Sequence, residues 1–359
     1  LHDTTRFDVT AYYCGPPSND PLNARFKSSV ESWRDIRGLS DDDAAKIIAK
    51  DGIDILIDVN GHTREARLGL FARRPAPVQV NWLGFPGTMG SSFHHYIIAD
   101  DFINPEAFEH FYSERVMRLP CYQPNDRQRI VAPEGISRAQ AGLPDDAFVF
   151  CSFNASHKIT RASFDRWSQI LERTPNSVLW LLDYTPTTNA HLQSYAAQRG
   201  IDPARLIFAP KLANPQHLAR IALADLVVDT APYGAHTTAS DALWMGVPVI
   251  TVAGRSFASR VCASLVRAAG LEELICATPE AFVETAVALA TSERSKLAAL
   301  RQKLIEGRDT SVLFDTPLLV ARLEDLFVQM AQAHQRGETP IPDLRNLAVY
   351  AEIGTSLDH

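Results

Sequence analysis

The chain has 359 residues, of which 46% are apolar, so it is long enough to bury two substantial cores. Its formal net charge of −7 excludes the broad basic surface of a nucleic-acid-binding protein. No run approaches the roughly 20 apolar residues of a membrane span, and no basic-then-apolar leader opens the chain, so we expect no membrane association. Five scattered cysteines without metal or redox spacing predict free thiols in a reducing compartment, and therefore a cytoplasmic protein.

The first 122 residues alternate apolar, β-rich runs with amphipathic stretches, a pattern typical of parallel sheets covered by crossover helices. Ser40, followed by Asp43, predicts the start of one such helix. The predicted strands are Phe7–Tyr13, Ile53–Asp58, Val78–Trp82, Tyr96–Ala99 and Val116–Leu119. We assign residues 1–122 to a first Rossmann-like domain, and residues 123–147, which are rich in Pro, Gly, Asn, Asp and Arg, to a linker.

A second series of alternating elements follows the predicted linker. Its strands are Phe148–Ser152, Val178–Leu182, Leu206–Phe208, Leu226–Asp229 and Val249–Thr251, and its helices are Arg161–Arg173, Asn189–Arg199, Pro215–Ala222 and Thr238–Gly246. Residues 279–336 are predicted to be helical throughout. We assign residues 148–336 to a second domain with terminal helices and residues 337–359 to a tail. The predicted fold class is α/β, with two doubly wound, Rossmann-like domains.

The segment from Asp229 to Val249 combines a strand, a glycine-containing loop and a helix. His236, Thr237 and Thr238 fall at the predicted helix start, where unpaired N–H groups and the helix dipole favour a phosphate. Asp241 follows about one turn later, where its carboxylate can accept hydrogen bonds from a ribose diol. The segment therefore indicates a site for a nucleotide diphosphate, and an ordinary helix capped by threonine is the alternative.

Two other loops of the second domain follow strands, where ligands of open parallel sheets bind. Lys158 lies just before a predicted helix, where its ammonium can neutralise a departing diphosphate; a solvated surface lysine is the alternative. His217 and Arg220 are three residues apart and share one predicted helix face. They either stack on and contact a nucleotide base, or belong to a solvent-facing polar stripe.

In the first domain, the loops Asp58–Arg64 and Trp82–Gly90 also follow predicted strands. The glycines of the second loop indicate that the backbone comes close to another group, such as a sugar, or that the loop is a tight turn without a ligand. His62 can be an acid, a base or a simple cap.

Several motifs are absent from the sequence. No Asp-x-Asp pair follows a predicted strand, and neither an HExxH nor a Walker lysine motif occurs, so we expect no metal and no other cofactor. No Gly-x-Gly-x-x-Gly follows a strand, which argues against a nicotinamide-dependent dehydrogenase.

Five motifs in fixed order resemble the catalytic region of the O-linked N-acetylglucosaminyltransferases, the O-GlcNAc transferase and SPINDLY-like proteins. They are residues 74–88 (RPAPVQVNWLGFPGT), 112–114 (YSE), 151–158 (CSFNASHK), 176–182 (NSVLWLL) and 236–244 (HTTASDALW). The resemblance covers roughly residues 1–335. It implies a GT-B fold, in which two Rossmann-like domains face each other across a cleft and the nucleotide sits mainly on the second.

The resemblance also implies roles for individual residues. Lys158 corresponds to a lysine that contacts the diphosphate and is needed for turnover. The implied UDP-binding residues are Leu212, His217, Arg220, His236, Thr237, Thr238 and Asp241. The residues implied on the sugar and acceptor side are His62, Arg64, Arg67, Gly84 and Pro86. The general base is not identified by these motifs.

Three departures from the family pattern qualify the resemblance. Asn214 stands where the animal enzymes have a lysine, and Tyr233 where they have a cysteine. The linker is too short for the large domain that animal enzymes insert there, which indicates a bacterial type. The family's first strand and a Gly-x-His-Pro loop fall upstream of Leu1, so the first domain is expected to be incomplete, with tetratricopeptide repeats upstream in the full-length protein.

The resemblance implies an inverting, metal-independent glycosyltransferase that moves N-acetylglucosamine from UDP to Ser or Thr hydroxyls of acceptor proteins. A UDP-N-acetylglucosamine 2-epimerase, which shares the GT-B architecture, is one alternative. A nucleotide-sugar-binding module without catalysis is another.

Overall fold

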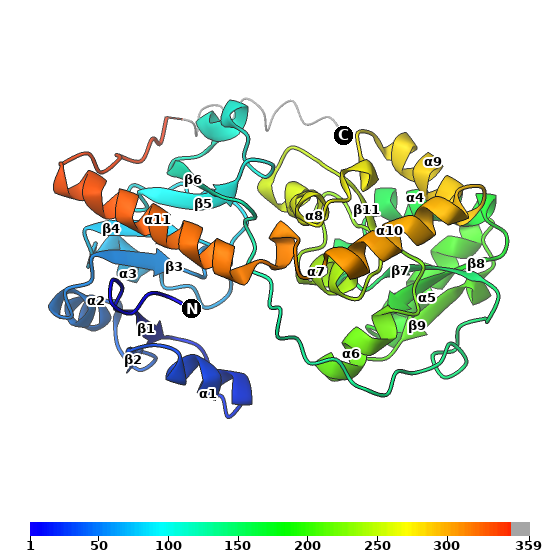
Figure 1. Ribbon diagram of the computed structural model, residues 1–359, viewed down its shortest axis with the longest axis horizontal. Coiled ribbons are helices and arrows are strands. Elements are labelled where there is room, and N and C mark those ends of the chain that lie inside the picture. Colours follow the sequence, from blue (N-terminus) through cyan, green and yellow to red (C-terminus); the bar gives the residue numbers. More distant parts are fainter. Residues whose placement is uncertain (346–359) are drawn as a thin grey trace. The chain divides into compact units, whose positions relative to one another are not determined.

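The computed structural model describes residues 1–345, which form two compact α/β units (Figure 1). The first unit contains Leu1–Tyr122 and the chain from Pro317, and the second contains Gln123–Thr316. Within the described residues, every strand pair is parallel. The predicted fold class, α/β with two parallel-sheet domains, is therefore confirmed.

The first unit contains a four-stranded sheet of order β3-β4-β5-β6 and a separate pair, β1-β2. The strands are β1 (Thr10–Tyr13), β2 (Ser32–Asp35), β3 (Ile55–Asp58), β4 (Val78–Asn81), β5 (Tyr96–Asp100) and β6 (Arg115–Leu119). The helices are α1 (Pro21–Ser28), α2 (Asp41–Lys50), α3 (Leu68–Ala72), the 3-10 helix η1 (Glu106–Phe111) and α11 (Thr316–Gln335).

Side chains alternate between the two faces of the four-stranded sheet, and both faces are buried. One face packs against α11 through Val78, Val80, Tyr96, Ile98, Leu119, Leu323, Leu326 and Met330. The opposite face packs against α2 and α3 through a cluster of Ile36, Ala44, Ile48, Leu56, Leu70, Phe71 and Ala76. Helices on both faces hold the strands in place, so the loops after β3 and β4 project from a rigid base.

The position of α11 differs from the prediction that residues 148–336 lie together in the second domain. This helix crosses the sheet of the first unit (Figure 1), and its apolar residues complete that core. Helical periodicity predicts an apolar face but not the sheet that buries it, so the sequence did not reveal the return of the chain. After α11, the backbone N–H of Asp343 donates to the Ser113 carbonyl at 2.7 Å. The rest of the predicted tail, residues 346–359, lies outside the described residues.

The second unit is built around one six-stranded sheet. Its strands are β7 (Phe148–Ser152), β8 (Ser177–Leu182), β9 (Leu206–Ala209), β10 (Leu226–Val228), β11 (Val249–Val252) and β12 (Ile275–Cys276). Its helices are α4 (Arg161–Arg173), α5 (Pro186–Gln198), α6 (Asn214–Ile221), α7 (Thr237–Trp244), α8 (Phe257–Ala268), α9 (Pro279–Ala290) and α10 (Arg294–Gly307). Four 3-10 turns, η2 (Ser156–Lys158), η3 (Pro203–Arg205), η4 (Glu272–Leu274) and η5 (Val312–Phe314), complete the described elements.

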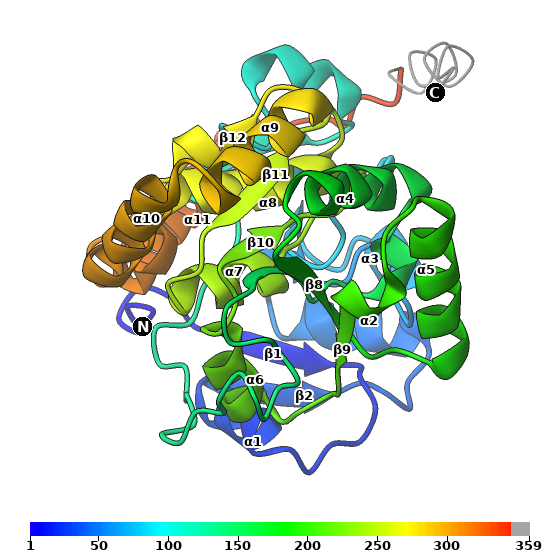
Figure 2. The same ribbon diagram turned by 90° about the vertical axis from the view of Figure 1, so that its right-hand side faces the viewer.

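The strand order in this sheet is β12-β11-β10-β7-β8-β9. The chain runs outward from β7 to β9 on one side and from β10 to β12 on the other, so its direction reverses between β7 and β10. Helices pack on both faces, with α4 against α9 and α7 against α8 (Figure 2). In open parallel sheets, ligands bind beyond the carboxyl ends of the strands at such a reversal point.

Candidate active site

The loops after β7 and β10 meet at the reversal point of the second sheet. Asn154, in the first loop, donates from Nδ2 to Thr230 Oγ1 at 2.9 Å and accepts from Thr238 Oγ1 at 2.7 Å. The buried carboxylate of Asp229 accepts from the backbone N–H groups of Thr230 and Ala235, each at 2.7 Å. These bonds join the two loops and hold Asn154 and Asp229 in place between them.

Lys158 lies half-buried at the end of η2, directed at the loop after β10. Its Nζ donates to the Gly234 carbonyl at 3.0 Å and lies 4.1 Å from the centre of the Tyr233 ring. Burial lowers the pKa of Lys158, and the charge of Asp229 opposes that shift. The side chain is therefore not the solvated surface lysine that the sequence left as an alternative. Its ammonium group is held in a partly desolvated environment, where a low dielectric constant strengthens its interaction with an incoming anion.

In the described part of the chain, several polar groups at the start of α7 have no partner. Within residues 1–345, the backbone N–H groups of Thr237 and Thr238 have no hydrogen-bond partner, and neither has the buried Nε2 of His236. Burial, followed by the charge of Lys158, lowers the pKa of His236 to about 4, so the ring is neutral at pH 7. The Tyr233 ring stacks on it at 5.1 Å. We call Lys158, His236, Thr237 and Thr238 the diphosphate cradle, because they combine a cation with free donors at a helix N-terminus.

His217 and Arg220 do not form a solvent-facing stripe. Arg220 is only 1% exposed, and its guanidinium donates to His217 Nδ1 at 2.8 Å and lies 4.9 Å from the Phe153 ring centre. Burial, and then the charge of Arg220, lowers the pKa of His217 to about 4. Because Nδ1 accepts from Arg220, the ring proton lies on Nε2. The buried guanidinium of Arg220 thus fixes the orientation of the neutral His217 ring through its Nδ1 atom.

Two further residues that were predicted to bind the nucleotide, Leu212 and Asp241, lie in the second unit. Leu212, in the loop after β9, is 40% exposed, which leaves an apolar side chain available to a ligand. Asp241, on α7, is buried and forms an ion pair with Arg129. Arg129 was not predicted as a site residue, because it lies in the segment assigned as a linker, which has no periodicity and is far from Asp241 along the chain.

In the first unit, the loops after β3 and β4 pack directly on each other. A Cβ on Gly84 would lie 2.1 Å from the Val59 carbonyl oxygen, so the close approach that the glycine permits is to backbone. His62 Nε2 bonds to the Met89 carbonyl at 3.0 Å, and its ring meets the Phe85 ring edge-on. Pro86, in the same loop as Gly84, is partly exposed. The structure thus brings His62, Gly84 and Pro86 together in one loop pair.

The two arginines predicted on the acceptor side differ in their surroundings. Arg64 has a side chain that is 94% exposed, beside Glu65. Arg67 points inward: it forms an ion pair with Asp41 and donates to the carbonyls of Ile36 and Leu39, each at 3.0 Å. Arg67 therefore joins α3 to the segment before α2, and only Arg64 is free to meet a partner.

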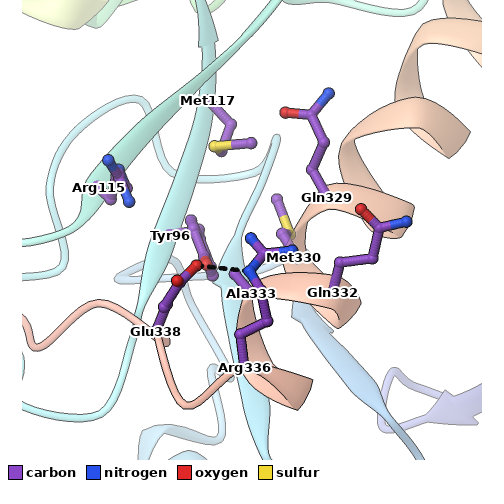
Figure 3. A pocket seen from close by; sticks show the side chains of 9 residues that line it. All are labelled: Tyr96, Arg115, Met117, Gln329, Met330, Gln332, Ala333, Arg336 and Glu338. Atoms are coloured by element: carbon purple, nitrogen blue, oxygen red, sulfur yellow. Dashed lines mark hydrogen bonds and ion pairs between the residues drawn. The ribbon is translucent and has the colours of Figure 1, made fainter.

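A pocket of about 370 Å³ in the first unit lies apart from these loops (Figure 3). It is lined by Tyr96 and Arg115, the first residues of β5 and β6, and by α11 residues that include Met330. Arg336 and Glu338, joined by an ion pair at 2.7 Å, form its rim. The strands of this sheet are parallel, so the pocket lies at their amino ends and adds nothing to the loops after β3 and β4.

Among residues 1–345, no group of three or more His, Cys, Asp or Glu side chains is arranged to hold a metal ion. No helix in this part of the chain is long and apolar enough to cross a membrane.

Comparison with known proteins decides the family. The sequence profile described as "Glycosyl transferase family 41" matches residues 1–124 and 125–323. The chain belongs to this family. Like the Thermobaculum structure described below, this family 41 chain has the two parallel-sheet domains of a GT-B glycosyltransferase.

Named relatives of this family 41 chain occur in plants, animals and bacteria. It is 38% identical over 347 residues to a probable UDP-N-acetylglucosamine–peptide N-acetylglucosaminyltransferase SEC of Arabidopsis thaliana. It is 30% identical over 459 residues to the UDP-N-acetylglucosamine–peptide N-acetylglucosaminyltransferase of Caenorhabditis elegans. These matches cover 95% and 96% of the chain but only 35% and 40% of the relatives. The solved structure of a lysine-to-methionine variant of Thermobaculum terrenum O-GlcNAc transferase matches 94% of this chain and 64% of its own, with 34% identity and a TM-score of 0.86.

Proposed function

We propose that the protein carrying this chain is an inverting, metal-independent glycosyltransferase that moves N-acetylglucosamine from UDP-N-acetylglucosamine to Ser and Thr hydroxyls of proteins. The diphosphate cradle is the observation that carries this proposal. It offers one ammonium, one neutral imidazole and two free backbone N–H groups at the reversal point of the sheet. The names of the plant and animal relatives support both the donor and the peptide acceptor.

The cradle suits the charge that develops in this reaction. The acceptor oxygen attacks the anomeric carbon, the bond from that carbon to the β-phosphate oxygen breaks, and its electron pair leaves with UDP. The acceptor hydroxyl loses its proton to a general base. Because negative charge grows on the β-phosphate as the bond breaks, Lys158 stabilises the transition state more than the bound donor. Fixed donors at the start of α7 perform the task that a Mg²⁺ ion performs in metal-dependent transferases.

The remaining residues of the second unit are assigned to the nucleoside. His217 stacks on uracil, Leu212 adds an apolar contact, and Asp241 accepts hydrogen bonds from the ribose. Arg220 acts through His217, since its guanidinium is buried behind that ring. This arrangement keeps the imidazole neutral and flat against a base.

The loop pair of the first unit is assigned to the sugar and acceptor side. His62, Gly84 and Pro86 belong to loops at the carboxyl ends of β3 and β4, where ligands of parallel sheets bind. Arg64 is the exposed contact for an acceptor, and Arg67 supports its loop from within. We also propose a cytoplasmic location, in agreement with the five free thiols.

The test is transfer of radiolabelled N-acetylglucosamine from UDP to Ser- and Thr-containing proteins in excess EDTA. Label bound to protein, with release of UDP, is the expected result. Conversion of the donor to its 2-epimer without an acceptor would assign the protein to the epimerases. Donor binding with neither transfer nor epimer formation would make it a binding module. Transfer that is lost in EDTA and restored by Mn²⁺ would refute the metal-independent mechanism.

A further inference from the structure

Arg129 makes an unusually complete set of contacts for a residue in an irregular segment. Its guanidinium forms an ion pair with Asp241 Oδ1 and donates to Ser240 Oγ. It also lies 5.7 Å from the ring centres of both Trp244 and Phe314. The side chains of Arg129 and Asp241 are only 9% and 11% exposed. These two polar contacts and two aromatic rings hold the guanidinium in place. In this position it is directed at the carboxylate of Asp241 on α7.

The second carboxylate oxygen of Asp241, Oδ2, lies outside the contact with Arg129. Within residues 1–345, no hydrogen-bond donor contacts Oδ2, although the residue is buried. Burial raises the pKa of Asp241, and the charge of Arg129, with which it forms an ion pair, opposes that shift. A fixed, charged carboxylate with one free oxygen is suited to accept hydrogen bonds from vicinal hydroxyl groups.

We propose that Arg129 is a positioning residue for nucleotide recognition: it holds Asp241 Oδ1, and thereby presents Oδ2 to the 2′- and 3′-hydroxyls of the ribose. This inference rests on the proposed function, because it takes Asp241 as the ribose-binding carboxylate. It adds that ribose specificity depends on a residue outside the helix that carries the carboxylate.

A purely structural role for Arg129 makes a different prediction, and Arg308 provides the matched control. Arg308 lies 4.8 Å from the centre of the same Trp244 ring, but among the described residues it forms no ion pair with Asp241. Replacing either arginine removes one cation–π contact with the Trp244 ring. Only the loss of Arg129 frees the carboxylate to turn, or to protonate.

The experiment is a calorimetric titration of UDP and 2′,3′-dideoxyuridine diphosphate into the protein and its variants. The parent protein should bind UDP roughly 10- to 100-fold more tightly than the dideoxy compound, as expected for hydrogen bonds to a charged acceptor. Arg129→Met should reduce this preference to about threefold or less, while affinity for the dideoxy compound changes little. Arg308→Met should keep the parental preference.

Two further variants make the test independent of folding defects. Arg129→Lys should retain part of the preference, since an ammonium can reach the carboxylate but cannot bridge Asp241 and Ser240 as a guanidinium does. In an Asp241→Asn background, which should itself lack the preference, Arg129→Met should have no further effect on it. If Arg129→Met does not fold, the UDP preference of Arg129→Lys is compared with that of the parent protein, both alone and in the Asp241→Asn background.

The outcomes separate this inference from the proposed function. Equal losses of affinity for both nucleotides in Arg129→Met would reduce Arg129 to a structural residue and overturn the inference, with the proposed function intact. A parent protein that binds UDP without any preference over the dideoxy compound would overturn the ribose role of Asp241 as well. A parent protein that binds neither nucleotide would contradict the proposed function itself.

Discussion

The loop after β3 in the first unit and the loop after β10 in the second unit differ in how their polar groups are used. In the first unit, Asp58 accepts from the N–H groups of Asn60 and Gly61 and bonds to His94, so its carboxylate is fully engaged inside the protein. In the second unit, the Nε2 of His236 and the first N–H groups of α7 have no partner within residues 1–345.

The difference distinguishes a framework from a binding site. Buried polar groups in folded proteins nearly always have partners, so the N–H groups that are unpaired within residues 1–345 and lie beside the Lys158 ammonium at the start of α7 are available to a ligand. Groups that are already satisfied, such as Asp58 or Arg67, can give a loop its shape but have little left to offer a substrate. Substitutions at the diphosphate cradle should therefore change turnover, whereas substitutions at already satisfied residues such as Arg67 should mainly change stability.

The largest effect is expected at Lys158. Replacement by alanine should lower kcat by about 100- to 1000-fold, since it removes a charge that acts as the leaving group departs, while donor affinity changes by less than about tenfold. Lys296→Ala, which removes an exposed lysine paired with Glu293, is the control and should leave both quantities unchanged. Steady-state kinetics with a direct measurement of donor binding checks both numbers. Unchanged turnover in Lys158→Ala would remove that residue from the mechanism.

The next effect is expected at Gly84. A methyl group there would collide with the Val59 carbonyl, a backbone atom that cannot turn away, so Gly84→Ala should destabilise the loop pair by about 1–3 kcal/mol. Gly38→Ala is the matched control in the same unit, because nothing lies within 4 Å of its added methyl group. Thermal or urea unfolding compares the two. Equal stability of both variants would show that the close contact is easily relieved.

A similar comparison uses the two arginines of the first unit. Arg67→Met should cost about 1–3 kcal/mol, since it leaves Asp41 and two carbonyls without a donor. Arg64→Ala should change stability by less than about 0.5 kcal/mol, because that side chain is almost wholly exposed, but it should raise KM for a protein acceptor. A stability loss in Arg64→Ala, or none in Arg67→Met, would reverse the roles assigned here.

The smallest effect at neutral pH concerns His217 and His236. Folding lowers the pKa of each from 6.5 to about 4, so the unfolded chain binds protons at a higher pH than the folded protein does. Their contribution to stability is therefore complete above pH 6.5 and is lost as the pH falls towards 4. NMR titration of the ring protons should find both midpoints well below 6, and midpoints near 6.5 would contradict the burial described for these rings.

Much of the second unit could be predicted because its local signals agree with its packing. The bounds of α4 coincide with the predicted helix, since Thr160 caps it by accepting from the Ser163 N–H at 3.2 Å and its apolar residues recur at helical spacing. Both loops that contain Lys158 and Gly234 were placed after strands, and they meet because the carboxyl ends of parallel strands share one edge of a sheet.

The missed features depend on contacts that no local pattern encodes. The strand β2 is four residues long, half-exposed and paired only with β1, so it has no apolar run. The inward direction of Arg67 depends on carbonyls about 30 residues away. By contrast, α8 went unassigned although Ser256 and the amphipathic residues after it were a usable signal.

The most direct test of the account is a calorimetric comparison of UDP with uridine on the unmodified protein in excess EDTA. If the diphosphate cradle binds the leaving group as described, UDP should bind at least about 100-fold more tightly than uridine, since several charge-assisted hydrogen bonds go to the phosphates alone. Equal affinities, or a preference for UDP that appears only when Mg²⁺ or Mn²⁺ is added, would contradict the account.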